Sequence, residues 1–244
     1  MNFTNKNVII TGGSAGIGLA TAKTFIEQGA QVLITGRNTD SLQAASVDIN
    51  SPNLKTLASD ISQLTDIATL EKEVAESGNK VDVLVLNAGI AKQYSIEDTT
   101  EEVFDDLFNI NVKGLFFTLQ KLIPHLSEGA SVILISSGVS VSGYAQMGAY
   151  AATKSAVDAI ARTAATELAD RKIRVNVVAP GLTDTPMNQQ TPEDIKNAIA
   201  AAVPLKRIGE AEEIANAIVF LASSGASYIS GSYLAVDGGV TIRR

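Results

Sequence analysis

The sequence predicts an α/β fold: a doubly wound parallel sheet of about seven strands with helices on both faces. Short runs rich in Val, Ile and Leu alternate with longer amphipathic segments, which is the pattern of successive βαβ units. Two runs, Val83–Leu86 and Val132–Ile135, are apolar at every position, so helices should cover both faces of those strands. No linker, repeat or low-complexity tract interrupts the alternation, so residues 1–244 are expected to form one domain.

The expected strands are, in chain order, Val8–Thr11, Val32–Thr35, Leu54–Ala58, Val83–Leu86, Val132–Ser136, Arg174–Val178 and Tyr233–Val236. The clearest helix start is a capping box, in which Thr99 precedes Glu102 by three residues and apolar residues follow at helical spacing. The exception is the stretch 181–207, which contains three prolines and is expected to be an irregular loop that covers a substrate. An inert surface connection is the alternative for this stretch.

Composition excludes several classes of function. The formal net charge of −7 disfavours a binder of nucleic-acid backbones, which needs clustered cations. The chain has no cysteine and a single histidine, His125, so disulfides, thiol chemistry and a His-rich metal site are not expected. No secretory signal or membrane span is visible, and we therefore expect a soluble, cytoplasmic protein.

A glycine-rich turn follows the first expected strand and opens a helix. It reads Thr11-Gly12-Gly13-Ser14-Ala15-Gly16-Ile17-Gly18, a GxxxGxG spacing. Glycines in such a turn let a pyrophosphate approach the N–H groups at a helix N-terminus, where the helix dipole favours anions. Because glycines serve many tight turns, a turn without a ligand is the alternative until other features are added.

The second expected strand ends in Thr35-Gly36-Arg37-Asn38, where NAD-binding proteins carry a carboxylate for the ribose 2′-hydroxyl. Arg37 instead offers a planar cation suited to a 2′-phosphate. The sequence therefore predicts a preference for NADP(H), with NAD(H) as a possible second cofactor. An ordinary solvated arginine is the alternative for Arg37.

Tyr150 and Lys154 stand four residues apart, on one face if this segment is helical. A nearby ammonium is expected to stabilise a phenolate and so to lower the pKa of the tyrosine, which suits proton transfer. A chance surface pair is the alternative.

With these motifs in order, the chain resembles a classical short-chain dehydrogenase/reductase over nearly its whole length. The further motifs that carry the resemblance are Asp60-Ile61, Asn87-Ala88-Gly89, Asn111-Val112-Lys113-Gly114, Ser136-Ser137, Pro180-Gly181 and Val236-Asp237-Gly238-Gly239. The resemblance implies a Rossmann-type fold and hydride transfer between a nicotinamide cofactor and a carbonyl or alcohol.

The resemblance also implies roles for particular residues. Tyr150 acts as the general acid or base, Ser137 polarises the carbonyl oxygen, Lys154 holds the nicotinamide ribose and lowers the pKa of the tyrosine, and Asn111 positions a water. An asparagine that satisfies a broken helix backbone is the alternative for Asn111. The cofactor-binding residues implied in this way, together with the glycine turn, are Gly12, Ser14, Gly16, Ile17, Gly18, Arg37, Asn38, Asp60, Ile61, Asn87, Ala88, Gly89, Tyr150, Lys154, Pro180, Gly181, Thr183 and Thr185. An ordinary strand-ending turn is the alternative for residues 87–89.

The expected substrate is a small or medium ketone or secondary alcohol, and the expected assembly is a homotetramer, as is common in the family. The substrate pocket is expected around Gln93, Tyr94, Val139, Gly143, Tyr144 and Met187. A 3-oxoacyl thioester is the second candidate, although Glu128 stands where a cation is expected and only Arg171 could replace it. A cofactor-binding sensor without turnover is an alternative of another class, and a nucleotide-sugar epimerase fits the length and the glycine spacing poorly.

Overall fold

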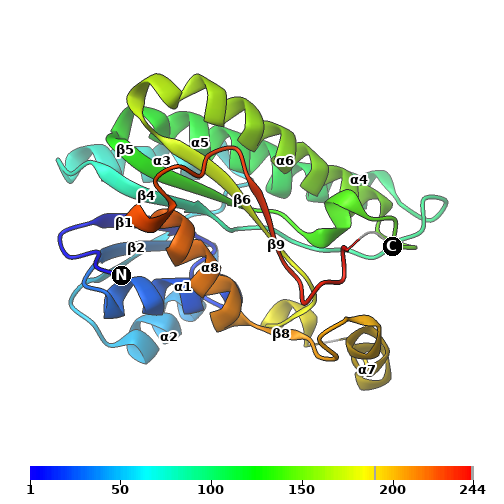
Figure 1. Ribbon diagram of the computed structural model, residues 1–244. Helices are drawn as coiled ribbons and strands as arrows, with labels where there is room; N and C mark the ends of the chain where they lie inside the picture. The colour runs from blue at the N-terminus through cyan, green and yellow to red at the C-terminus, as the bar shows by residue number, and fades with distance from the viewer. Residues whose placement is uncertain (190, 243–244) are drawn as a thin grey trace.

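The computed structural model describes residues 1–189 and 191–242. Seven parallel strands form one sheet in the order β3-β2-β1-β4-β5-β6-β9 (Figure 1). The strands are β1 Asn7–Thr11, β2 Gln31–Gly36, β3 Leu54–Ala58, β4 Val81–Leu86, β5 Leu126–Ile135, β6 Arg174–Pro180 and β9 Tyr233–Val236. The predicted fold class and all seven predicted strands are confirmed, although β5 begins six residues earlier than the sequence suggested.

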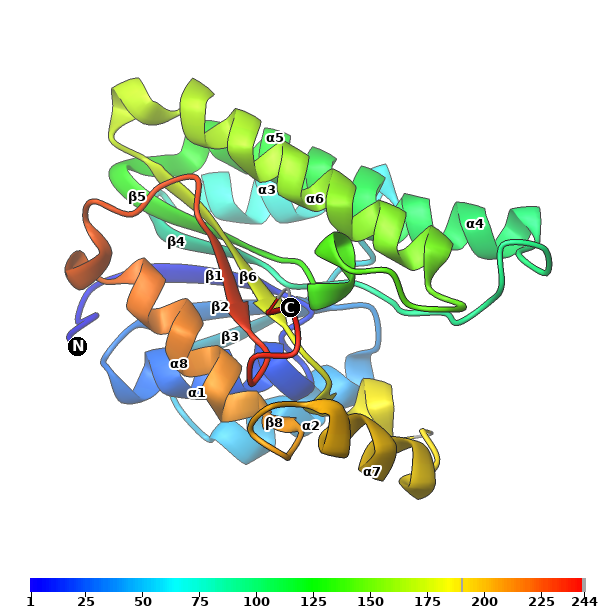
Figure 2. The same ribbon diagram turned by 45° about the vertical axis from the view of Figure 1, so that its right-hand side comes forward.

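Helices cover both faces of this sheet (Figures 1 and 2). One face carries α1 Gly16–Glu27, α2 Thr39–Ile49 and α8 Ala211–Ala222. The opposite face carries α3 Leu64–Glu76, α5 Leu115–Leu122 and α6 Gly148–Glu167, and α4 Glu101–Phe108 extends this layer.

The side chains of successive residues in each strand point alternately to the two faces of the sheet. Ile10 packs with Phe25 of α1 in one buried cluster, whereas its neighbour Ile9 packs in the other cluster with Leu119 of α5. The alternation of side chains across a strand therefore requires apolar residues at consecutive positions, which is why the strands read as unbroken apolar runs.

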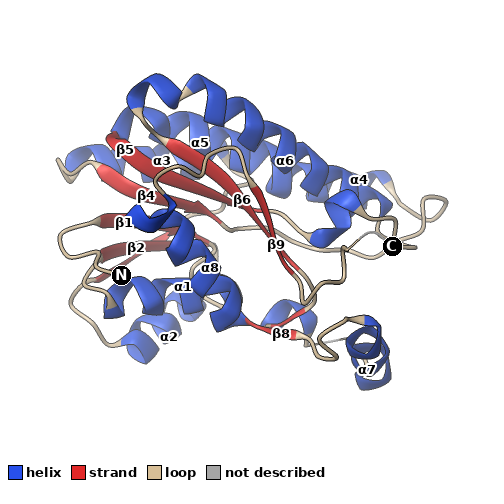
Figure 3. Cartoon of the chain, in the orientation of Figure 1, coloured by secondary structure: helices blue, strands red, loops and turns tan. Residues whose placement is uncertain are grey.

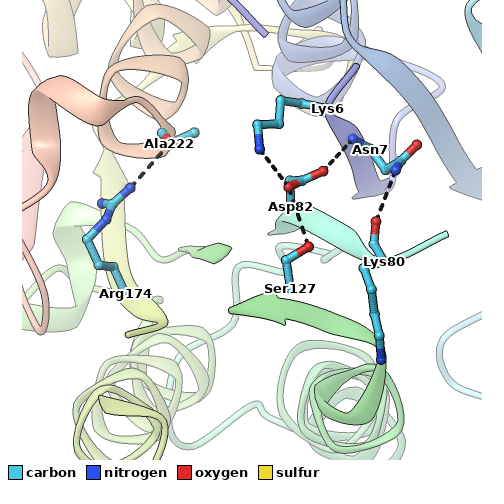
Figure 4. A network of polar contacts seen from close by, with 7 residues as sticks. All are labelled: Lys6, Asn7, Lys80, Asp82, Ser127, Arg174 and Ala222. Atoms are coloured by element: carbon cyan, nitrogen blue, oxygen red, sulfur yellow. Dashed lines mark hydrogen bonds and ion pairs between the residues drawn. The ribbon is translucent and has the colours of Figure 1, made fainter. Parts of the chain in front are cut away.

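The amino ends of the strands are tied together by polar contacts. Asp82 of β4 accepts hydrogen bonds from the Lys6 ammonium at 2.9 Å and the Asn7 backbone N–H at 3.0 Å, and from the Ser127 hydroxyl at 3.4 Å (Figure 4). Arg174, at the start of β6, donates to the carbonyl of Ala222 at the end of α8. These contacts hold together the amino ends of the strands, at the end of the sheet opposite the glycine turn.

Two local expectations were wrong. The cap of α4 is Thr100, which accepts a hydrogen bond from the Val103 N–H, whereas the Thr99 hydroxyl donates to the Ser95 carbonyl. The stretch 181–207 is also more regular than expected, since it contains α7 Glu193–Ala202 and a short strand, β7 Thr183–Asp184, that pairs with β8 Gly209–Glu210. Pro192 is the N-cap of α7 and Pro204 follows its C-cap, Val203, so these two prolines bound a helix of ten residues and do not interrupt it.

Candidate active site

The candidate site lies at the carboxyl ends of the strands. The chain leaves β1 for β2 on one side and returns to β4 on the other, so the loops after β1 and β4 diverge and leave a crevice between them. The glycine turn follows β1, and the Asn87-Ala88-Gly89 turn follows β4. In open sheets of this kind, ligands bind at this reversal of strand order.

The glycine turn has the geometry that a phosphate requires. Gly12 and Gly16 adopt positive φ angles of 65° and 52°, which other residues rarely adopt. A side chain at Gly18 would place its Cβ 2.2 Å from the Gly12 carbonyl oxygen, so only glycine lets α1 begin this close to β1. The N-terminus of α1 is therefore held against the crevice, with Ile17 in its first turn.

Asn87 binds the two turns together. Its side-chain amide donates to the carbonyls of Thr11 at 3.0 Å and Gly12 at 2.9 Å. The Thr11 hydroxyl accepts from the backbone N–H groups of Asn87 and Ala88. The amide of Asn87 thus shapes the turn by holding its backbone.

The loop after β6 lies over the same turn. A Cβ on Gly16 would be 3.2 Å from the Cβ of Thr185, which brings Thr185 beside the expected position of a pyrophosphate. Gly181 is bonded through its N–H to the Val236 carbonyl, and the buried Thr183 donates its hydroxyl to the Gly181 carbonyl. Pro180 is buried as the last residue of β6.

Arg37 and Asp60 line one cavity of about 620 Å³ beyond the end of β2. The Ser14 hydroxyl would lie 3.1 Å from a Cβ on Gly36, which places it near the start of the Arg37 segment. Asn38 caps α2 by accepting from the Ser41 N–H, so its side-chain oxygen already has a partner. Ile61 is buried, and its carbonyl packs against Gly114. Arg37 and Asp60 therefore both line this cavity, whereas the buried Ile61 is not among its lining residues.

Asn111 lies in a π-helical segment, Asn109–Gly114, between α4 and α5. Its side-chain oxygen accepts from the Ile90 N–H at 2.8 Å, and its amide donates to the Ile90 carbonyl at 2.9 Å and the Thr153 hydroxyl at 3.1 Å. A Cβ on Gly89 would be 3.0 Å from the Asn111 oxygen and 3.5 Å from the Lys154 ammonium. These contacts favour the alternative in which Asn111 satisfies backbone groups, and they place it within the same cluster as Lys154.

Lys154 is buried on α6, with 5% of its surface exposed. Its ammonium donates to the carbonyl of Ile135, at the end of β5, over 2.9 Å. Burial lowers the pKa of Lys154 to about 8, because a desolvated ammonium is less stable than the neutral amine. The helix thus carries its cation to the carboxyl end of the central strands.

Tyr150 lies one turn earlier on α6, and the Ser137 hydroxyl faces its phenol closely enough to lower its pKa. Burial has the larger effect, however, and raises the pKa of Tyr150 to about 12. Burial therefore outweighs any lowering by Lys154, so in this arrangement the phenol is not acidic, contrary to the expectation. The ammonium lies over the ring, 5.7 Å from its centroid. With a pKa of about 12, the phenol keeps its proton at ordinary pH.

Sequence reasoning missed four residues of this region. Gly13 packs against Ile34 where no side chain fits, and Thr153 accepts the Asn111 amide while donating to the Tyr150 carbonyl. Asp158 is a buried carboxyl one turn beyond Lys154, and the Tyr233 hydroxyl donates to the Ser137 carbonyl at 3.2 Å. The i, i+4 spacing from Lys154 was the signal available for Asp158; strand pairing alone brings Tyr233 to Ser137.

Three of the side chains that are expected around the substrate are exposed. Tyr94 is 42% exposed, Tyr144 is 45% exposed and Met187 is 56% exposed. The Tyr94 N–H donates to the Gln146 carbonyl, which joins the loop after β4 to the loop before α6. The loops expected to form the substrate pocket therefore meet at least at this point.

Comparisons with known proteins show which family the chain belongs to. A family model described as "Enoyl-(Acyl carrier protein) reductase" matches residues 12–241. The chain is 35% identical to the 3-oxoacyl-[acyl-carrier-protein] reductase FabG of Thermotoga maritima, over 99% of this chain and all of that one. It is 38% identical to a 3alpha-hydroxysteroid dehydrogenase of Mediterraneibacter gnavus, over 98% of both chains. It is 39% identical to a glucose 1-dehydrogenase of Gluconobacter oxydans, over 98% of this chain and 93% of that one.

Among solved structures, a short-chain dehydrogenase/reductase from Brucella melitensis, titled a glucose/ribitol dehydrogenase, superposes with a TM-score of 0.94. It is 31% identical to this chain, with 98% of this chain and 99% of that one covered. The chain belongs to the short-chain dehydrogenase/reductase family, and it is an oxidoreductase that acts on CH–OH or C=O groups. Members bind a nicotinamide cofactor.

The glycine turn is the part of this chain that fits such a cofactor. Positive φ angles at Gly12 and Gly16 open the backbone, and a Cβ at Gly12 would be 2.9 Å from the Ala88 Cα.

Across the described residues, no helix has the length and apolar character needed to span a bilayer.

Proposed function

We propose that the protein is an NADP(H)-dependent carbonyl reductase that interconverts a ketone and a secondary alcohol. The observation that carries the proposal is the approach of the Ser137 hydroxyl to the Tyr150 phenol, beside the buried Lys154 ammonium. Both hydroxyls lie at the carboxyl ends of the strands, the same end of the sheet that bears the glycine turn. A nicotinamide cofactor, when bound, supplies or accepts the hydride.

In the reducing direction, Tyr150 donates its proton to the carbonyl oxygen while the carbonyl carbon gains the hydride. Ser137 donates a hydrogen bond to the same oxygen and so stabilises the negative charge that develops on it. The resulting phenolate is stabilised by the Lys154 ammonium, which lies over the same ring. In the oxidising direction, Tyr150 is the base. A neutral phenol favours reduction, because the proton to be donated is already in place.

The cofactor preference rests on the end of β2. Arg37 lines the cavity there, and Ser14 lies close to its segment, so both can contact a 2′-phosphate. Lys92 and Lys113 line the same cavity and add positive charge, although Lys92 forms an ion pair with Asp106 at 2.6 Å. A ratio of kcat/KM for NADPH over NADH well above one supports the proposal, and a preference for NADH contradicts it.

The remaining cofactor contacts follow from the same placement. We propose that Asp60 contacts the adenosine, that the Asn87–Gly89 turn faces the adenosine ribose, and that the loop of Pro180, Gly181 and Thr183 faces the nicotinamide. Thr185, which lies against Gly16, is placed to reach the pyrophosphate or carboxamide.

A 3-oxoacyl thioester is the second candidate substrate, favoured by the relative from Thermotoga maritima. Arg171, the one cation expected to recognise an acyl carrier, is already engaged. Arg171 donates to the carbonyls of Ile123 and Leu126, and Glu128 pairs with Lys172. We therefore keep a ketone or secondary alcohol as the first candidate.

One experiment separates these candidates. NADPH consumption is measured with a panel of aliphatic ketones, cyclic ketones and 3-oxoacyl thioesters. Turnover of simple ketones supports the first candidate, and selective turnover of thioesters supports the second. Tight NADPH binding with no turnover of any member would identify a sensor and refute the enzymatic proposal.

We also propose that the stretch 181–207 covers the substrate. No residue of α7 is buried, and α7 lies apart from both helical layers (Figure 3). An element with so few packing contacts can move at little cost in free energy. Limited proteolysis with and without NADPH tests this role, since a cover should become protected when the site is filled.

A homotetramer is the assembly we propose, with α5 and α6 at one interface and the C-terminal segment at another. The exposed Phe116 on α5 supports the first interface, because it is 45% exposed in the isolated chain. Light scattering coupled to size-exclusion chromatography measures the mass directly, and a monomeric mass would contradict this proposal.

A further inference from the structure

Asp158 is a buried carboxyl that the proposed mechanism does not use. It lies four residues after Lys154 on α6, so the two side chains share one face of the helix. Only 5% of its surface is exposed, and its Oδ1 atom has no hydrogen-bond partner among the described residues. Burying such a group is costly unless a neighbouring charge compensates it.

The carboxyl faces the backbone segment that carries Ser137. The hydroxyls of Ser136, at the end of β5, and Ser140 lie close enough to favour its ionised form. The Ser140 hydroxyl also donates to the Tyr233 hydroxyl at 3.3 Å, and Tyr233 donates in turn to the Ser137 carbonyl. Asp158 therefore adjoins the polar groups that hold Ser137 in place.

The charged and titratable groups around Asp158 come from two elements. Lys154 and Arg162 face it from α6, one turn before and one turn after, and both favour the carboxylate. Tyr233 faces it from β9. Burial raises the pKa of that tyrosine, Asp158 and Asp237 raise it further, and the Ser140 hydroxyl lowers it. Lys154 is the buried cation of this set, whereas Arg162 is exposed to solvent.

Each of the two buried groups counteracts the effect that desolvation has on the pKa of the other. Burial lowers the pKa of Lys154 to about 8, and the negative charge of Asp158 acts in the opposite direction. Burial likewise raises the pKa of Asp158, while Ser136, Ser140, Arg162 and Lys154 lower it. The Lys154 ammonium donates to the neutral Ile135 carbonyl, and no ion pair with Asp158 within 4.0 Å is found among the described residues, so the carboxylate acts on the ammonium through space from the same face of α6.

We propose that Asp158 is a positioning residue of the proton-transfer site: its buried carboxylate keeps the Lys154 ammonium charged one helical turn away. The proposal rests on the function assigned above to Tyr150 and Lys154, because a charged Lys154 is what stabilises the phenolate. Asp158 itself touches neither substrate nor cofactor and acts through Lys154.

The direct test measures the charge of Lys154 without any turnover. Lysine labelled with ¹³C at Cε is followed by NMR against pH in the full-length protein, and the Lys154→Arg variant assigns the resonance. In Asp158→Asn the Lys154 midpoint should fall by about one pH unit or more, which is about a tenfold loss of proton affinity. The matched control is Glu167→Gln, which removes the same charge from an exposed position on α6 and should leave the midpoint unchanged.

Each outcome decides the proposal. An unchanged Lys154 midpoint in Asp158→Asn overturns it, as does an equal shift in Glu167→Gln. Asp158→Ser is the second neutral variant in case asparagine does not fit the site, and Asp158→Glu should keep the midpoint near that of the unmodified protein. Loss of the folded state in both neutral variants, seen by circular dichroism, assigns Asp158 to folding and also overturns the proposal.

A second measurement connects the charge to the reaction. NADPH-dependent reduction of the carbonyl compound of the panel above that is turned over fastest is followed against pH in Asp158→Asn and in the unmodified protein. The alkaline fall in kcat/KM should begin about one pH unit lower in the variant, whereas rates near pH 6 should agree within a few-fold. Full activity of a Tyr150→Phe variant would refute the proposed function, but it would leave the NMR result standing.

Discussion

The Lys154 ammonium lies 5.7 Å from the centroid of the Tyr150 ring and donates a hydrogen bond to the Ile135 carbonyl at 2.9 Å. The hydrogen bond to the end of β5 therefore fixes the Lys154 ammonium against one face of the Tyr150 ring. Its position is suited to stabilise negative charge that forms on the ring, while the phenol itself stays neutral until it gives up a proton.

Replacing Tyr150 by Phe should lower kcat for carbonyl reduction by roughly 100-fold or more, because the proton donor is lost while the ring is kept. The Kd for NADPH, measured by fluorescence quenching, should stay within about threefold of its original value. Tyr228→Phe is the matched control, since Tyr228 is fully exposed. Near-normal turnover in Tyr150→Phe would remove Tyr150 from the mechanism.

Reduction should slow as the pH rises past about 8. The ammonium of Lys154, whose pKa is about 8, loses its charge there, while Tyr150, with a pKa near 12, keeps its proton. The kcat/KM for reduction, measured from pH 6 to 10, should show this alkaline fall. In Lys154→Arg the fall should move to higher pH even if the rate is lower, because arginine stays charged throughout that range. If the alkaline fall in kcat/KM stays at the same pH in this variant, the titration of another group causes it.

Replacing Arg37 by Gln should weaken NADPH binding by roughly 10- to 100-fold, because a phosphate loses its charge-assisted partner. The Kd for NADH should change little, which makes NADH the internal control. Isothermal titration with both cofactors measures the two values in one preparation. Equal weakening of the two would show that Arg37 supports the fold of the cavity and does not select the phosphate.

Replacing Gly13 by Ala should destabilise the protein even without cofactor. A Cβ there would lie 2.5 Å from the Ile34 Cβ, so the turn or β2 must shift. Such overpacking costs about 1–3 kcal/mol, which corresponds to a fall in Tm of at least roughly 2 °C for a protein of this size. Gly143→Ala is the control, since a Cβ at Gly143 meets no atom within 4 Å. Similar melting curves for both variants would contradict the packing argument.

The fold was predictable because its signals are local. Unbroken apolar runs such as Val83–Leu86 can be buried only between two helical layers, and the glycine turn marks the passage from β1 to α1. The order of these motifs along the chain was enough to indicate the family. The cap of α4 shows the limit of local signals, because two adjacent threonines compete for it and only the path of the chain selects Thr100.

The sequence by itself determined the strands, the glycine turn and the candidates Tyr150 and Lys154, because periodicity and spacing act over a few residues. Tertiary structure alone decided their environment. Burial raised the pKa of Tyr150 and lowered that of Lys154, and it enclosed Asp158 beside Ser136 and Ser140. Proton affinity depends on the solvent and charges around a group, and these come from β5, α6 and β9, which meet only when the chain is folded.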